Sequence, residues 1–193
     1  MEPQRLCAMI AQAKAGRAEA YEALLEAYGP RLYGYFFHAT HSHHDAEDLL
    51  GDMMLRLVRT LKKYDHRGRF EPWLFRIAAN MVRDRIRRRK VRPAAMSLSA
   101  EGGSGEPLAD RVAAKHRPVD AALLAGEASA ALNEALEKLD VTTREMILLR
   151  HFGQMSFKEI GELLGSPLGT VLARVHRGLK ALRRIMGEEN ADA

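Results

Sequence analysis

Apolar residues recur at helical spacing along most of the chain, and the alternating runs typical of strands do not occur. One helix is expected from about 17 to 39, interrupted or bent at Gly29-Pro30. A second is expected to begin near Asp45, whose carboxylate can cap it. A third has Pro72 in its first turn, where proline's missing N–H leaves no bond unmade. The pattern therefore predicts an all-α fold.

The second and third helices each have one apolar face that is expected to pack inward. On the second helix this face consists of Leu49, Leu50, Met53, Met54, Leu57, Val58 and Leu61. On the third helix it consists of Trp73, Leu74, Ile77, Ala78, Met81, Val82 and Ile86. The third helix then continues into the basic run 83–92, which contains one acidic residue, Asp84. Such a run is usually a solvated face. If the chain also contains a DNA-binding module, the run is expected to contact nucleic acid.

Helical periodicity stops between the two halves of the chain. The run 99–107 is rich in Ser, Gly and Glu, which is the composition of a flexible linker. The sequence therefore predicts two small helical domains, 15–92 and 120–186, joined by a flexible linker over 93–119.

Capping residues place two helix boundaries in the second half of the chain. Thr142 and Glu145 have the spacing of a capping box, which predicts the start of a helix over 143–152. Gly153 is expected to end that helix. The segment that follows, 156–184, has the pattern of a helix-turn-helix.

The first helix of this segment is predicted by Ser156 and Glu159, a second capping-box pair, and it is expected to end at Gly165. Ser166 is expected to cap the second helix. The face of that helix expected to pack inward consists of Val171, Val175, Leu179 and Leu182. Arginines remain on its other faces and suit the major groove of DNA. The alternative is a helical hairpin with a solvated basic face.

Composition narrows the class of protein. The net charge is +5, and the basic residues are clustered. The single cysteine, Cys7, excludes an internal disulfide and is expected to be buried beside Leu6 and Ile10. No apolar run is long enough to span a bilayer, and the N-terminus lacks a signal-peptide core. We therefore expect a cytoplasmic protein with no direct membrane insertion.

Four histidines lie close together in the sequence: His38, His41, His43 and His44. A tetrahedral metal site needs further ligands, and no cysteine or second cluster supplies them. We therefore expect solvated loop histidines, no metal and no cofactor. Nucleophile elbows, Walker loops and zinc-protease motifs do not occur, which argues against an enzyme.

Several segments in each half of the chain carry a resemblance to one family. In the first half they are DAEDLLGDMML (45–55), Tyr64-Asp65 and FEPWLFRIAAN (70–80). In the second half they are SFKEIGELLGSPLGTV (156–171) and RVHR (174–177). The first set resembles region 2, and the second resembles region 4, of the extracytoplasmic-function sigma factors of bacterial RNA polymerase. The resemblance covers most of residues 15–92 and 125–186.

This resemblance implies a sigma factor, which works by binding rather than by catalysis. It implies that the chain binds core RNA polymerase, at the β′ clamp helices and the β flap, and directs initiation by recognising the −10 and −35 promoter elements. It also implies a dedicated anti-sigma factor. The alternative is a stand-alone helix-turn-helix regulator, which would bind duplex DNA without polymerase.

The resemblance also assigns candidate site residues. Core polymerase docking falls to Asp48, Asp52 and Arg56. Contacts with the −10 element fall to Asp65, Arg67, Arg69, Phe70, Trp73, Asn80, Arg83, Arg87 and Arg88. Contacts with the −35 element fall to Ser166, Thr170, Leu172, Ala173, Arg174, Arg177 and Lys180. Two alternatives stay open: Trp73 as a core anchor, and the two aspartates as favourable charges near a helix start.

Three positions depart from the family pattern. Gly51 stands in the docking helix where a glutamine is common, which removes a polar contact. Leu172 and Ala173 stand where a basic residue and a serine are common. These two side chains can contact a thymine methyl group but cannot donate a hydrogen bond to guanine. The promoter motif therefore need not match that of better-known relatives.

Overall fold

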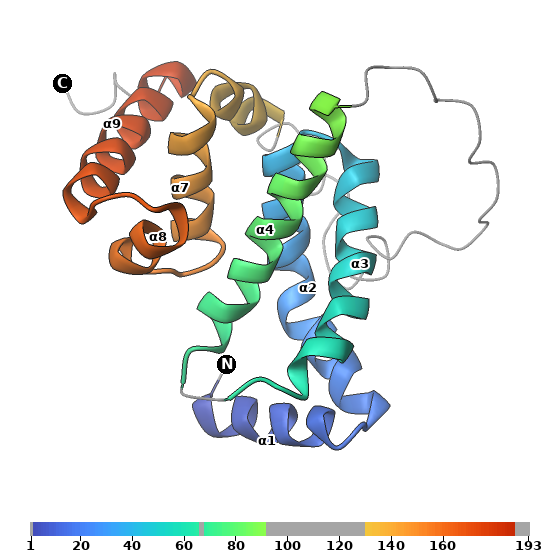
Figure 1. Cartoon of the computed structure of the whole chain (residues 1–193). Coiled ribbons are helices and arrows are strands. Elements are labelled where there is room, and N and C mark those ends of the chain that lie inside the picture. The colour runs from blue at the N-terminus through green and yellow to red at the C-terminus, as the bar shows by residue number, and fades with distance from the viewer. Residues whose placement is uncertain (1, 66–67, 92–129, 188–193) are drawn as a thin grey trace. The chain divides into compact units, whose positions relative to one another are not determined.

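The computed structural model describes residues 2–65, 68–91 and 130–187, and every regular element within them is a helix (Figure 1). The all-α prediction is therefore confirmed. The helices are α1 (Pro3–Lys14), α2 (Ala18–Thr40), α3 (His43–Leu61), α4 (Phe70–Val91), α7 (Val141–His151), α8 (Phe157–Leu164) and α9 (Leu168–Met186). A further helical segment spans 130–137.

The chain divides into two compact units. The N-terminal unit holds α1, α2, α3, Phe70 and α4 from Arg76 onward, and the C-terminal unit holds Glu71–Phe75 and the described residues from 130 onward. The linker expected over 93–119 lies outside the described residues, so its flexibility and both domain boundaries stay predictions.

Helix α2 is central to the N-terminal unit, because both α1 and α3 pack against it (Figure 1). It runs from Ala18 to Thr40 through Pro30 without the expected interruption. Proline removes one hydrogen bond from the helix ladder, but buried side chains on both sides of it hold the helix in place. These side chains are Leu24, Tyr28, Leu32, Tyr35 and Phe36, each at most 3% exposed.

The start of α3 differs from the prediction. The cap is Ser42, whose hydroxyl accepts a hydrogen bond from the Asp45 N–H at 3.2 Å. Asp45 lies inside the first turn, and its carboxylate pairs with Arg85 and Arg89 instead of capping the helix. The predicted apolar face is buried except at Met54, which is half-buried, and Val58, which is 43% exposed. Helix α4 begins at Phe70, so Pro72 falls in its first turn as predicted.

Helix α7 also begins with a cap that the sequence did not predict. The Asp140 carboxylate accepts a hydrogen bond from the Thr143 N–H at 3.0 Å, so the predicted capping box of Thr142 and Glu145 is wrong. At the other end of the helix, Phe152 is the cap, and the left-handed residue in the following turn is Gln154, not Gly153.

In the helix-turn-helix, the predicted capping box and the predicted end of α8 are confirmed. The Ser156 N–H donates to the Glu159 carboxylate at 2.7 Å, and the Ser156 hydroxyl accepts from the Glu159 N–H at 3.2 Å. Gly165 has φ 63° and ends α8, as predicted. The predicted Ser166 cap is wrong, because α9 starts after Pro167 with no side-chain cap.

Helix α9 packs on α7 and α8 through a narrow face (Figure 1). Val171, Val175 and Leu182 are buried as predicted, whereas Leu179 is 44% exposed. The closest approach to α7 is at Gly178, where a Cβ would lie 2.5 Å from Thr143 Cγ2 and 2.8 Å from Ile147 Cδ1. This contact requires a residue without a side chain.

Replacement of Gly178 by alanine is therefore expected to destabilise the C-terminal unit by about 1–3 kcal/mol through overpacking, although alanine favours helices. Gly169→Ala on the same helix is the matched control, because its Cβ would meet no atom within 4 Å. That control should be neutral or stabilising by up to about 1 kcal/mol. Urea unfolding followed by circular dichroism measures both; equal midpoints for the two variants would contradict the packing argument.

Candidate nucleic-acid interface

The exposed face of α3 holds the three residues expected to dock on polymerase. Asp48, Asp52 and Arg56 are one turn apart, and all three are exposed. Asp48 also accepts a hydrogen bond from Arg85 Nη2 at 3.1 Å. Leu55 also lies on this face, 61% exposed between Asp52 and Arg56, and was not predicted. Its position outside the apolar stripe of α3 could have indicated that it is exposed.

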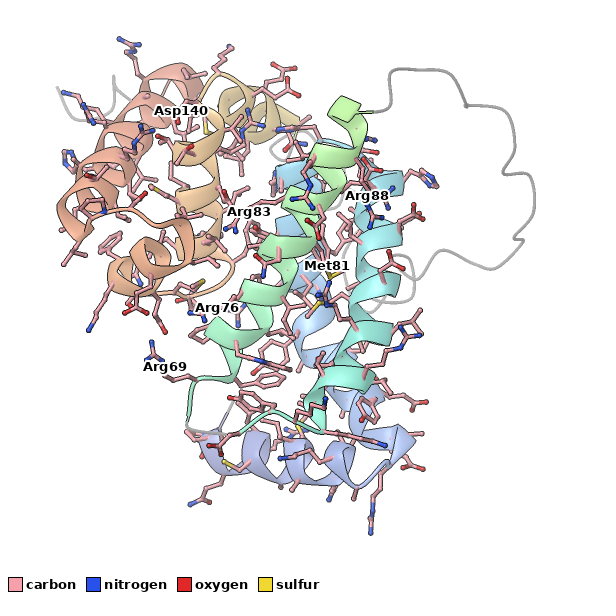
Figure 2. All side chains as sticks on the ribbon, in the orientation of Figure 1. Arg69, Arg76, Met81, Arg83, Arg88 and Asp140 are labelled. Atoms are coloured by element: carbon pink, nitrogen blue, oxygen red, sulfur yellow. The ribbon has the colours of Figure 1, made fainter. Side chains whose placement is uncertain are left out.

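A groove of about 940 Å³ runs between α3 and α4. Its apolar lining is Leu49, Leu55 and Met81, and charged side chains of both signs surround them. Figure 2 shows Met81 and Arg88 on the side of α4 that faces α3. This groove therefore combines an apolar floor with the Asp52 and Arg56 face of α3.

A buried carboxylate joins α4 to the start of α3. The Asp45 side chain is 3% exposed, and its two oxygens pair with two arginines of α4. Arg85 Nη1 lies 3.3 Å from Oδ1, and Arg89 pairs with Oδ2. A carboxylate leaves water at a large cost unless it is paired, so these contacts fix both helices. Arg85 and Arg89 therefore hold α4 in place.

The other arginines of α4 differ in their surroundings. Arg87 pairs with Asp84 at 2.8 Å, and Arg83 Nη1 donates to Asn80 Oδ1 at 3.2 Å. Figure 2 shows Arg83 and Arg76 on the side of α4 opposite Arg88. Arg76 is exposed and was missed in the sequence analysis, although it lies one turn before Asn80. The basic run therefore does not act as one uniform surface.

Phe70 does not suit the role expected for it. Its side chain is 1% exposed, and its ring makes edge contacts with Tyr28 and Tyr64, at centroid distances of 5.3 and 5.6 Å. Stacking on a base needs an exposed ring face, so we correct this assignment to a core anchor for the start of α4.

The remaining residues expected at the −10 element are distributed around the start of α4. Asp65 and Arg69 are exposed, and Arg67 lies outside the described residues. Trp73 is half-buried, so its side chain suits both a core anchor and a contact with a base. The backbone carbonyl of Tyr64 accepts a hydrogen bond from Lys14 Nζ at 2.8 Å, which ties the segment between α3 and α4 to α1.

We expect Asp45→Asn to lower the free energy of unfolding of the N-terminal unit by about 3 kcal/mol, because it breaks a buried ion pair. Asp48→Asn is the matched control on the same helix: its side chain is 42% exposed. Asp48→Asn should lower the free energy of unfolding by about 1 kcal/mol or less. Chemical denaturation of both variants measures the difference, and a loss of similar size in each would refute the structural role of Asp45.

Helix α9 exposes most of the residues expected to contact the −35 element. Thr170, Leu172, Ala173, Arg177 and Lys180 are exposed, and Ser166 is half-buried. Arg177 Nε donates to the Ala173 carbonyl at 3.3 Å on its own helix. The outward face of α9 therefore carries cations from Arg177 onward.

Arg174 is half-buried and contacts the start of α7. Its Nη1 donates to Asp140 Oδ1 at 2.9 Å and lies 3.4 Å from the Thr143 hydroxyl oxygen. Asp140 is also the cap of α7, so one carboxylate joins the start of α7 to α9. The side-chain hydrogen bond with Thr143 and the positive charge of Arg174 lower the pKa of Asp140 below its ordinary value of 3.8.

Because the folded chain lowers this pKa, ionised Asp140 stabilises the C-terminal unit above pH 3.8, and the contribution is lost as the pH falls through the lowered value. At pH 7, Asp140→Asn should therefore unfold at a lower urea concentration than the natural chain. The gap between the two midpoints should narrow below about pH 4. A gap that stays constant down to pH 2 would show that Asp140 acts without its charge.

The prediction of loop histidines is wrong for His43 and His44, which lie in the first turn of α3, and His38 is buried in α2. His43 Nδ1 lies 2.7 Å from the Tyr33 hydroxyl, and its ring stacks on Phe37 at 4.2 Å. His44 Nε2 lies 3.7 Å from Asp48 Oδ2. Within the described residues, no group of three or more His, Cys, Asp or Glu side chains could hold a metal ion. Cys7 is exposed, so its predicted burial is wrong.

No helix among the described residues has the length and apolar character needed to cross a membrane.

Comparisons with known proteins match both units to one family. Residues 24–92 match Sigma-70 region 2, and residues 129–182 match Sigma-70, region 4. The ECF RNA polymerase sigma factor SigW of Bacillus subtilis is 30% identical over 91% of this chain and 93% of its own length. The RNA polymerase sigma factor CarQ of Myxococcus xanthus is 33% identical over 90% of this chain and 92% of its own length.

Two solved structures are similar in fold. CnrH, solved in complex with the cytosolic domain of CnrY, is 25% identical with a TM-score of 0.63, and the match covers 94% of this chain and 97% of that one. The sigma factor RpoE of Bartonella quintana, solved with the anti-sigma factor NepR, is 18% identical with a TM-score of 0.64. That match covers 90% of this chain and 100% of the solved one.

Proposed function

Because this chain belongs to the extracytoplasmic-function sigma factors of the sigma-70 family, we propose that it directs RNA polymerase to promoters through separate surfaces on its two units. The observation that carries the proposal is the outward face of α9, where exposed side chains follow the turn of a helix-turn-helix. We also propose the domain boundaries 15–92 and 120–186, which the family matches at 24–92 and 129–182 support.

The exposed face of α3 is the proposed docking surface for core polymerase. Asp52, Leu55 and Arg56 combine an exposed apolar side chain with charges of both signs, which is the composition of a protein interface with a polar rim. Asp48 is the least suitable of the expected residues, because it already pairs with Arg85. The groove between α3 and α4 extends this surface.

Opening of the −10 element falls to α4 and the loop before it. Trp73 supplies an aromatic surface for an unstacked base, and Asn80 supplies hydrogen-bonding edges. Arg76 and the other exposed arginines, together with the half-buried Arg83, supply charge for the phosphates of the opened strands. Phe70 supports this surface from the core.

Contacts with the −35 element fall to α9, in the major groove. Thr170 and the cations Arg177 and Lys180 suit phosphates and base edges. Arg174 is assigned a positioning role, because its guanidinium pairs with Asp140.

The proposed mechanism needs no catalytic group, since each step is a binding event, and it takes place in the cytoplasm with the polymerase. An anti-sigma factor is a proposed partner, of the kind found in the solved complex of the sigma factor RpoE with the anti-sigma factor NepR. The stand-alone regulator is not favoured, because both family regions are present in order.

The division of labour is tested by two substitutions in a transcription assay with core polymerase. Arg177→Ala should reduce the contribution of the −35 element to initiation about tenfold, while affinity for core polymerase stays unchanged. Arg56→Glu should reduce core affinity without changing the relative use of −35 variants, because it reverses a charge at the docking face. Arg184→Ala, exposed in the last turn of α9, serves as the control.

Equal loss of both properties in either variant would contradict the two-surface division. A purified chain that protects an operator from cleavage without polymerase, and never directs initiation with it, would instead support the stand-alone regulator.

A further inference from the structure

The first six residues of α9 carry no charged side chain. From Leu168 to Ala173 the sequence is LGTVLA, and within it Val171 alone is buried. Leu168 is 50% exposed and Leu172 is 43% exposed. They lie four residues apart and therefore project from neighbouring positions on one side of the helix.

The fully buried face of α9 does not include these two leucines. The packing face consists of Val171, Val175 and Leu182, with Gly178 at the closest approach to α7. Next to the leucines lie Gly169, where an added Cβ would meet no atom within 4 Å, and the exposed methyl group of Ala173. The result is an apolar patch, Leu168, Gly169, Leu172 and Ala173, that is open to a partner.

Position and charge indicate what this partner is. The N-terminal residues of the second helix in a helix-turn-helix are those that contact base edges in the major groove. The exposed cations of α9 begin further along, at Arg177 and Lys180, and suit phosphates. Arg174 pairs with Asp140. The exposed start of α9 is therefore uncharged and, apart from Thr170, apolar, and the part that follows it is cationic.

The four base pairs differ in what they present to such a patch. Guanine recognition needs donors to O6 and N7, and cytosine recognition needs an acceptor, which apolar side chains lack. Thymine alone presents an apolar group, its C5-methyl, in the major groove. We propose that the apolar patch of α9 selects T·A pairs in the −35 element through thymine methyl groups, with Leu168 as a specificity residue beside Leu172. This inference rests on the proposed function of α9.

The test begins with holoenzyme assembled from core polymerase and the full chain. Transcription from templates with a randomised upstream segment, followed by sequencing of the productive templates, identifies the selected −35 motif. Each thymine of that motif is then replaced singly by deoxyuridine, which removes the methyl group and leaves the pairing edge intact. Initiation should fall about fourfold at each position where a methyl group is buried.

Substitutions connect this loss to the patch. In Leu172→Ala or Leu168→Ala holoenzyme, thymine and deoxyuridine should become equivalent at one of the sensitive positions. Leu179→Ala is the matched control, because this leucine of the same helix is 44% exposed but lies beyond the first two turns. It should keep the full thymine preference. Circular dichroism of each variant checks that the chain is folded.

Two results would overturn the inference: initiation that is insensitive to deoxyuridine at every position, or a thymine preference that survives both Leu168→Ala and Leu172→Ala. Loss of core polymerase binding in these variants, with the thymine preference intact, would assign the patch to a protein contact instead. Failure of the proposed function is distinguishable, because the holoenzyme would then show no dependence on the upstream segment at all.

Discussion

The buried carboxylate of Asp45 is the interaction on which the N-terminal unit depends for the placement of α4. A charged group that is 3% exposed must be paired, and Arg85 and Arg89 are the residues that pair with it. This pairing fixes the register of α4 against α3, because the two arginines lie one turn apart. The proposed docking face of α3 and the proposed nucleic-acid side of α4 are therefore held in a defined relation by Asp45.

The C-terminal unit uses the same arrangement on a smaller scale. Asp140 caps α7 and binds Arg174 of α9, so an aspartate at the start of one helix again holds an arginine of the helix proposed to contact DNA. In both units the arginines divide into those that position the helix and those that remain exposed. Positive charge in the sequence therefore overstates the number of unpaired cations, because Arg85 and Arg89 pair with the buried Asp45 and Arg174 pairs with the exposed Asp140.

The comparison with the sequence separates local from tertiary information. The capping box of Ser156 and Glu159 and the left-handed Gly165 were predictable, because every atom involved lies within one turn of the chain. The roles of Phe70 and Arg174 were not, because they depend on Tyr28, Tyr64 and Asp140, which are distant in sequence. The family resemblance identified the correct segments, but it could not show which side of each helix is buried.

Separation of the apolar and cationic parts of α9 has a consequence for specificity. Phosphate contacts contribute affinity to every sequence equally, whereas contacts with base edges contribute to a few sequences. A cation that contacts phosphates therefore raises affinity for every sequence and leaves the ratio between preferred and other sequences unchanged. The first six residues of α9 hold no cation, and Arg174, which follows them, pairs with Asp140. In the proposed complex, discrimination by this helix therefore comes from shape and methyl groups, whereas the cations of its later turns add affinity alone.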